Sequence, residues 1–398
     1  MSNRLSVFLS YGFRPFFLFG PAYAAVAMIA WMAWIGIHAA GGQIISMSTD
    51  FPPFRWHAHE MLFGYGLAII TGFFLTAVPS WTASKPISGK PLGALVLLWL
   101  AGRVVIWFSA SLPPVVVASV DMAYIPFLMV LVFPKLMARK TPRNLIFLPI
   151  LAALFVANTL VHLERMDVEW ASMETGHWLA LDILLMMIVI IGGRIIPAFT
   201  TNTLRKLGED NFPVSDAITD KLAILSIIAL AVADVADFND TVTGWLALFA
   251  AVINAWRLSR WRGLKVLNVP IMWIVHLGYL WLVIGLALRA AALLNGFMNE
   301  ATAAHALTVG CIGSMTIGVL TRASLGHTGR EIKAPGAMVL AYLLISVAAA
   351  SRIIGPAWLP QFYNESMIIS GISWSIAFLI IATINWPILT KPRWRVAG

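Results

Sequence analysis

Long apolar stretches alternate with short polar segments along the whole chain. Each stretch is about 20 residues long, the length that a helix needs to cross the hydrocarbon core of a bilayer. Twelve such stretches occur, at 13–37, 58–82, 92–111, 113–137, 145–163, 175–199, 217–235, 242–258, 270–293, 302–322, 335–354 and 367–389. The pattern therefore predicts an all-α polytopic membrane protein, with about twelve transmembrane helices in a single transmembrane domain that covers residues 1–398.

The composition supports this prediction and excludes other classes. Of the 398 residues 60% are apolar and 11% are charged, whereas soluble proteins average about 45–50% and about 25%. The single cysteine, Cys311, excludes a disulfide scaffold. The first apolar stretch is too long for the core of a cleavable signal peptide.

The net charge of +9 comes from basic residues that gather in every second connection between the stretches. Because cytoplasmic loops of membrane proteins are enriched in lysine and arginine, this bias predicts that both termini are cytoplasmic. It also explains the net charge without a nucleic-acid partner. The connections after the fourth and eighth stretches show the bias best, with Lys135, Arg139, Lys140, Arg143, Arg257, Arg260, Arg262 and Lys265.

The second, sixth and tenth stretches share a spacing. Each opens with a histidine, and a threonine follows 23 residues later: His59 and Thr82, His177 and Thr200, His305 and Thr328. The histidines are 118 and 128 residues apart, which is about four stretches. The spacing predicts three pseudo-symmetric four-helix units, approximately 1–140, 141–265 and 266–398.

Several motifs around these histidines resemble the NnrS family. They are GFRPFF at 12–17, WHAHEMLFGY at 56–65, GFFLTAVPSWT at 72–82, GGRIIPAFTTN at 192–202 and HALTVGCIGSMTIGVLTRASLGHTGR at 305–330. The resemblance implies a multi-pass protein of the bacterial cytoplasmic (inner) membrane that carries haem and copper and is linked to denitrification and nitric oxide resistance. A more distant analogy is the large subunit of haem–copper oxidases. Unlike that subunit, this chain has no histidine in its seventh stretch, so the three-histidine site cannot form in its usual place.

Five histidines lie at the predicted outer ends of the stretches, and we expect them to bind metal: His57, His59, His162, His177 and His305. Imidazole is a suitable ligand for haem iron and for copper, although a single interfacial histidine would need no such role. Residues two apart on a helix point about 200° from each other, so His57 and His59 cannot easily share one metal from a helical segment. Either the helix begins at His59 and His57 lies in an extended segment before it, or the two histidines serve different centres. The preferred axial haem pair is His59 and His305, and His57, His162 and His177 are candidates for a second metal. His57 and His59 could exchange roles.

Other polar residues in the stretches are assigned by position. Arg55 and Arg289 are the basic residues nearest the outer histidines and are expected to bind haem propionates. Glu60 and Asp182 are expected to carry protons, and Asp182 could instead orient a ligand imidazole. Arg103 and Asp121 would meet at one depth and form a structural ion pair. His276 is expected to be a packed histidine bonded to a carbonyl, and His38 and His327 to face the loops.

The leading functional hypothesis is a haem protein that binds nitric oxide and reduces it to N2O, with His177 at the reactive centre. The absence of a C-x-x-C-H motif indicates that the haem is held non-covalently, as haem b. Electrons would come from a quinol, a periplasmic cytochrome or a cupredoxin. The alternative is a non-enzymatic protein that senses nitric oxide or handles haem, copper or iron nitrosyl species.

Overall fold

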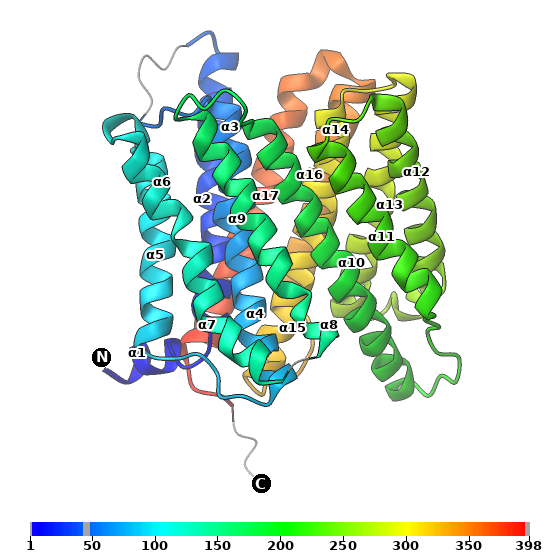
Figure 1. Cartoon of the computed structure of the whole chain (residues 1–398). Helices are drawn as coiled ribbons and strands as arrows, with labels where there is room; N and C mark the ends of the chain where they lie inside the picture. The colour runs from blue at the N-terminus through cyan, green and yellow to red at the C-terminus, as the bar shows by residue number, and fades with distance from the viewer. Residues whose placement is uncertain (1, 43–47, 140, 395–398) are drawn as a thin grey trace. The chain divides into compact units, whose positions relative to one another are not determined.

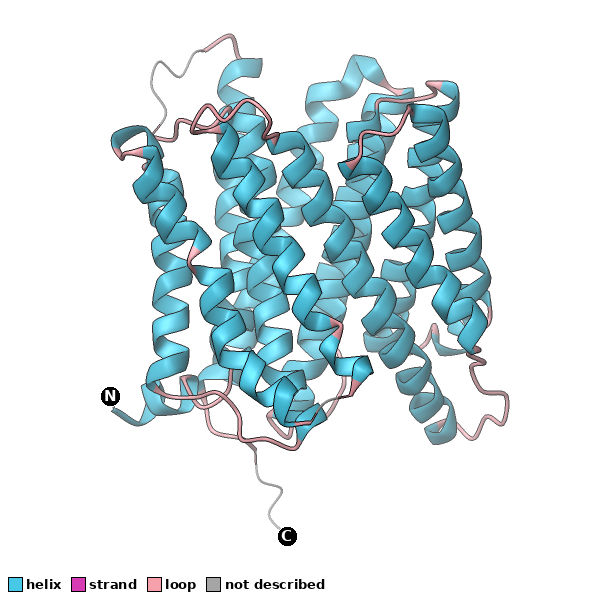
Figure 2. Ribbon diagram, in the orientation of Figure 1, coloured by secondary structure: helices cyan, strands magenta, loops and turns pink. Residues whose placement is uncertain are grey.

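The computed structural model describes residues 2–42, 48–139 and 141–394. These residues form helices joined by loops, and no strand occurs among them (Figures 1 and 2). In this part of the chain, eleven helical segments are long and apolar enough to cross a membrane. The expected all-α polytopic membrane fold is therefore confirmed.

Each expected span corresponds to one helix or to consecutive helical segments. In chain order they are α2 (Phe13–Ala39), α3 (Pro53–His59) with η1 (Glu60–Gly66) and α4 (Leu67–Thr82), α5 (Lys90–Trp107), α6 (Pro114–Met122) with α7 (Tyr124–Ala138), α9 (Phe147–Glu164), α10 (Met173–Lys206), α11 (Ala217–Val235), α12 (Asp240–Ser259), α13 (Pro270–Asn295), α14 (Glu300–His305) with η4 (Ala306–Gly313) and α15 (Ser314–His327), α16 (Gly336–Trp358) and α17 (Tyr363–Thr390). Between them lie the short segments α1 (Ser2–Phe8), η2 (Ser109–Ser111), α8 (Pro142–Leu145), η3 (Gly263–Val266) and η5 (Pro360–Phe362).

The helix α11, expected as the seventh span, is not among the eleven apolar segments, because it carries Asp220, Lys221 and Asp234. Two of these charges have partners on neighbouring helices. Asp220 pairs with Arg257 of α12 at 2.7 Å, and Asp234 pairs with Arg289 of α13 at 2.6 Å. Pairing lowers the cost of placing charges in an apolar bundle, which explains how α11 packs against α12.

The helices form two compact units. Unit 1 comprises Met1–Ala180, Ala323–Glu331 and Ile381–Gly398, and unit 2 comprises Leu181–Arg322 and Ile332–Ile380. In unit 1, α2 packs against α4, α4 against α7, and α7 against α9. In unit 2, α13 packs against both α12 and η4, and α16 also contacts η4. The three four-helix units expected from the histidine spacing stay a prediction.

Two of the three repeated histidines share a local backbone feature. A π-helical segment begins directly after His59, as η1, and directly after His305, as η4. Such segments are frequently found at functional sites. The three spaced threonines also behave alike: each is buried and donates its hydroxyl to the carbonyl oxygen four residues earlier, as seen for Thr82, Thr200 and Thr328.

Candidate metal centre

The sequence places His59 at the end of a short helix. Proline is favoured in the first turn of a helix, and α3 begins with Pro53. His59 is the last residue of α3 and is completely buried. Its Nδ1 lies 2.9 Å from Oε1 of Glu60, the first residue of the π-helical η1, which is also completely buried. The imidazole is thus held on one side by the carboxylate that follows it.

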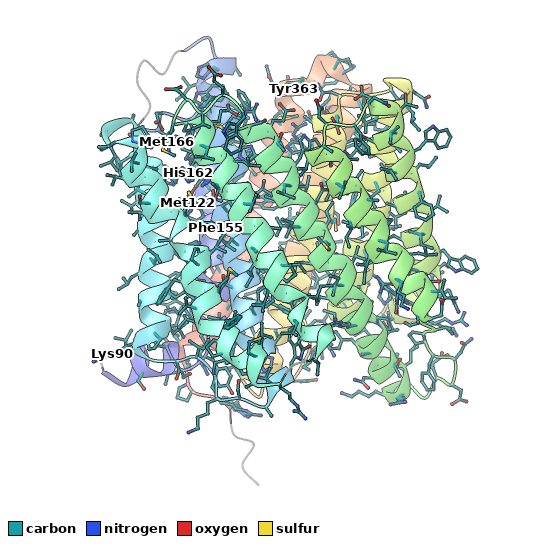
Figure 3. The ribbon with its side chains drawn as sticks, in the orientation of Figure 1. Lys90, Met122, Phe155, His162, Met166 and Tyr363 are labelled. Atoms are coloured by element: carbon teal, nitrogen blue, oxygen red, sulfur yellow. The ribbon has the colours of Figure 1, made fainter. Side chains whose placement is uncertain are left out.

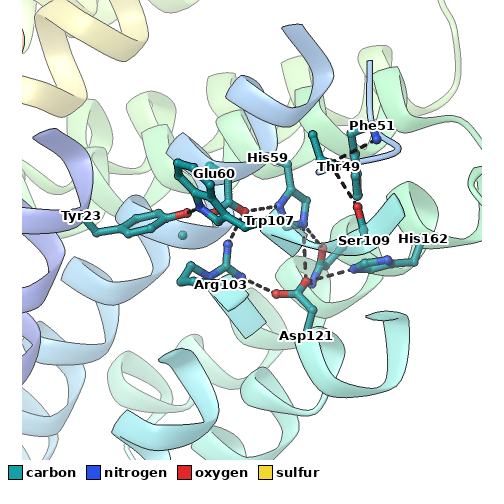
Figure 4. Close-up of polar contacts among 12 residues, drawn as sticks. Tyr23, Thr49, Phe51, His59, Glu60, Arg103, Trp107, Ser109, Asp121 and His162 are labelled. Atoms are coloured by element: carbon teal, nitrogen blue, oxygen red, sulfur yellow. Dashed lines mark hydrogen bonds and ion pairs between the residues drawn. The ribbon is translucent and has the colours of Figure 1, made fainter. Parts of the chain in front are cut away.

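An arginine joins the two acidic residues of the site. Arg103 on α5 forms ion pairs with Glu60 and with Asp121 on α6, and all three side chains are buried (Figure 4). The expected pair between Arg103 and Asp121 is therefore confirmed. Gly102 permits their approach, since a Cβ atom at this position would lie only 3.0 Å from Oδ1 of Asp121.

His59, Asp121 and His162 form a candidate metal triad. One ligand atom from each residue lies within 4.8 Å of the other two, and all three residues are buried. Oδ2 of Asp121 lies 3.0 Å from Nε2 of His162 and 3.4 Å from Nε2 of His59. Figure 3 shows His162 towards the end of unit 1 opposite Lys90, so the triad lies at the end of the unit away from that lysine.

Asn158 of α9 completes the contacts of His59. Its amide nitrogen donates to Oδ2 of Asp121 at 2.8 Å, which directs its Oδ1 towards Nε2 of His59 at 3.1 Å. Both nitrogens of His59 therefore face acceptor oxygens, although a neutral imidazole has only one N–H to donate. If Nδ1–H donates to Glu60, the lone pair on Nε2 and the oxygens of Asn158 and Asp121 face one another. A cation between them would remove this conflict.

The charges of the site also favour a bound cation. With neutral imidazoles, Arg103 balances only one of the two carboxylates of Glu60 and Asp121. One negative charge is then left inside the bundle, where unbalanced charge is costly. Oε2 of Glu60 is also buried and has no hydrogen-bond partner among the described residues. Two imidazoles, a carboxylate and one excess negative charge form a donor set for a transition-metal ion.

Aromatic and charged side chains lie beside the triad. The ring of Phe51 lies 5.5 Å from the imidazole of His59 and 6.4 Å from that of His162, and it is almost fully buried. The guanidinium of Arg165 lies 4.3 Å from the same ring and binds Asp50 at 2.5 Å. Phe51 and Arg165 thus separate the imidazoles of His59 and His162 from solvent on this side of the triad.

The arrangement suits a small ion better than a haem at His59. Axial ligation would require Nε2 of His59 to face the iron, with the wide porphyrin plane around it. The carboxylate of Asp121 and the amide of Asn158 already lie within 3.4 Å of that nitrogen. A haem does not fit on Nε2 of His59 in this arrangement.

The structure brings together two of the five predicted histidine ligands, His59 and His162. His57 also lies on α3, but its ring stacks on Trp31 of α2 at 4.9 Å, so the two histidines of the H-x-H pair face different neighbours as expected. His177 is half-buried, and its Nε2 has no hydrogen-bond partner among the described residues. His305 belongs to unit 2, where its Nδ1 lies 2.5 Å from the carbonyl oxygen of Ala301.

The two arginines expected at haem propionates already bind carboxylates. Arg55 pairs with Glu174 at 3.3 Å near the surface. Arg289 is buried in unit 2 and pairs with Asp234 and Glu300. Of the two expected proton carriers, Glu60 contacts His59, whereas Asp182 is buried in unit 2.

The other three histidines, His276, His38 and His327, are not part of the triad. His276 is buried as expected, but its partner is the hydroxyl of Thr200, at 2.9 Å from Nε2, and not a carbonyl. The expectation failed because Thr200 points across from α10 to the imidazole on α13. His38 and His327 are exposed, as expected for loop-facing residues.

Sequence reasoning did not identify Asp121 as a ligand or Asn158 as part of the site. A usable signal exists in the sequence. Asn158 and His162 are four residues apart and therefore share one face of α9, and Asp121 is an acidic residue within an apolar span.

The comparisons with known proteins place the chain in a family. No curated protein matches it. The family model described as NnrS protein matches residues 7–393, nearly the whole chain. On this match, the chain belongs to the NnrS family, as its motifs suggested.

Proposed function

We propose that this protein binds nitric oxide at a transition-metal ion held by His59, His162 and Asp121. Membership of the NnrS family fits a nitric-oxide-related membrane protein. The observation that carries the proposal is the buried triad, with its ligand atoms within 4.8 Å of one another. Copper is the metal that the family resemblance favours, and two imidazoles with a carboxylate also suit non-haem iron.

The surrounding residues prepare this site for a metal. Glu60 accepts the Nδ1–H of His59 and so leaves Nε2 for the metal, an arrangement common among metal-bound histidines. Asn158 and Arg103 hold the carboxylate of Asp121. His162 donates Nε2–H to Asp121, so binding a metal through Nε2 would require this proton to move to Nδ1, the other ring nitrogen. When bound, the metal would supply an open coordination position for nitric oxide.

The proposal extends to the reduction of nitric oxide at this site. Two molecules of nitric oxide, two protons and two electrons would give N2O and water, with electrons from a quinol, a periplasmic cytochrome or a cupredoxin.

On the positive-inside rule, both termini would be cytoplasmic, in the inner membrane of a bacterium, and the triad would lie in the outer half of the bilayer. A haem b, if present, would use histidines outside the triad, and His57, His177 and His305 stay candidates.

The test is metal analysis of the purified protein with an electron paramagnetic resonance spectrum before and after nitric oxide. Wild type should hold one copper or iron ion per triad, with a spectrum that changes with nitric oxide. His59→Ala and His162→Ala should lose both the metal and the change. His38→Ala, at an exposed histidine, is the control and should keep them.

Absorption spectra of the oxidised, reduced and nitric-oxide-treated protein would detect haem. Anaerobic loss of nitric oxide with N2O release would separate an enzyme from a sensor or carrier. Wild-type protein without a transition metal, or triad variants with wild-type metal content, would rule out the triad as the binding site.

A further inference from the structure

A second buried cluster of charged residues lies in unit 2, outside the metal triad. Arg289 of α13 binds Asp234 of α11 through both terminal nitrogens, at 2.8 and 2.6 Å, and its Nε donates to Glu300 of α14 at 2.8 Å. Asp182 of α10 lies next to these groups. We call these four residues, Asp182, Asp234, Arg289 and Glu300, the carboxyl cluster.

Asp182 is the unusual member of the carboxyl cluster. Its exposed fraction is only 1%, and neither carboxyl oxygen has a hydrogen-bond donor among the described residues. Its neighbour is the carboxyl of Asp234, close enough for a hydrogen bond if one of the two carries a proton. Two ionised carboxylates cannot share such a site at reasonable cost, because like charges repel and burial removes their hydration.

The carboxyl cluster has fewer positive charges than carboxyl groups. Arg289 supplies one positive charge against the three carboxyl groups of Asp182, Asp234 and Glu300. Glu300 has a side chain that is 32% exposed, so water can solvate its charge. Arg289 balances Asp234, and one positive charge is then needed at Asp182.

A proton fits this position better than a metal ion. The charged groups that act on Asp182 include Asp234, Arg289 and Glu300, which are two carboxylates and a guanidinium. Both oxygens of Asp234 already accept from the guanidinium of Arg289, whose positive charge would repel a bound metal. A protonated Asp182 needs no further ligand, because its O–H can donate directly to Asp234.

We infer that Asp182 holds an exchangeable proton, and that the carboxyl cluster is a proton-binding site separate from the metal triad. In the loaded state the Asp182 O–H donates to the Asp234 carboxylate. In release, the proton passes from Asp182 by way of Asp234 and Glu300 to water, and no other bond changes. Buried ionisable groups inside membrane proteins commonly mark proton pathways.

The test is infrared spectroscopy of the purified full-length protein in H2O and in D2O. Wild type should show the carbonyl band of a protonated carboxylic acid, and this band should shift on transfer to D2O without unfolding. Asp182→Asn should lose one such band and keep the wild-type thermal stability, because asparagine is uncharged and can donate to Asp234. Asp240→Asn, at an exposed acid of α12, is the control and should keep the band.

Glu300→Gln tests the route to water. It should keep the Asp182 band and slow its shift in D2O several-fold. If Asp182→Asn does not fold, labelling wild-type protein with ¹³C-aspartate should shift the same band and so assign it to an aspartate.

Three results would overturn the inference. One is a wild-type spectrum with no protonated aspartate band. Another is a band that does not respond to D2O in the folded protein. The third is thermal stability that depends on sodium or another metal cation in wild type but not in Asp182→Asn, which would identify a bound metal ion in place of the proton.

Discussion

Nδ1 of His59 lies 2.9 Å from Oε1 of Glu60, the next residue in the chain. The π-helical η1 begins at Glu60, so the carboxylate that orients the imidazole comes from the point where the backbone changes its helical form. This pair gives the candidate metal centre both its imidazole orientation and part of its negative charge.

Glu60→Gln is therefore expected to weaken metal binding while the fold is retained. The substitution removes the excess negative charge and weakens the acceptor for Nδ1–H of His59. Loss of a carboxylate that orients a metal-bound histidine lowers metal affinity about 10–100-fold. Titration of the metal-free protein with copper or iron measures this change. Glu174→Gln, at an exposed acid, should leave the affinity unchanged, and equal affinities in Glu60→Gln and wild type would contradict the assigned role.

Arg103→Met is expected to destabilise unit 1 strongly. It leaves the buried carboxylates of Glu60 and Asp121 without their shared cation. Removing one partner of a buried ion pair costs roughly 3–5 kcal/mol. Thermal unfolding in detergent should show the lower transition temperature.

The control for Arg103→Met is Arg55→Met, which breaks the near-surface pair with Glu174. Such pairs contribute about 0–1 kcal/mol, so its transition should stay near that of wild type. Equal effects of the two substitutions would mean that the buried arginine is not the main electrostatic support of the site.

Two adjacent glycines in unit 2 should respond differently to alanine. A Cβ atom on Gly193 would overlap the guanidinium of Arg257, which is fixed by the carbonyl of Val189 at 2.8 Å and by the hydroxyl of Tyr279 at 3.1 Å. Overpacking of this kind costs about 1–3 kcal/mol. On Gly192 the same atom would lie 3.4 Å from the ring of Tyr279, an ordinary contact. Gly193→Ala should lower the thermal transition and Gly192→Ala should not; the reverse order would contradict this packing.

Thr200→Val should destabilise the protein more than Thr201→Val. The Thr200 hydroxyl donates to the carbonyl of Ile196 at 2.8 Å, so Nε2–H of His276 must donate to Thr200. Valine leaves that buried N–H unpaired, at a cost of about 1–3 kcal/mol. Thr201 bonds to the carbonyl of Pro197 within its own helix. Thermal unfolding compares the two variants, and similar transitions would show that the bond to His276 adds little.

The sequence alone determined the elements of this protein. Stretches of about 20 apolar residues require helices in lipid, because every backbone group must be hydrogen-bonded within the segment. The expected span 217–235 coincides with α11. The helical angle of about 100° per residue also separated His57 from His59 correctly.

Only the tertiary structure decided which polar residues meet. Asp121, His162 and His59 come from three helices, and their contact depends on the rotation and packing of α6, α9 and α3 against one another. Sequence spacing describes positions along one helix, and it contains no measure of which face turns towards a neighbour. The ion pair of Arg103 and Asp121 was predictable because the two residues lie on consecutive antiparallel helices at one depth, whereas the contacts of α9 and α3 with Asp121 join segments distant in the chain.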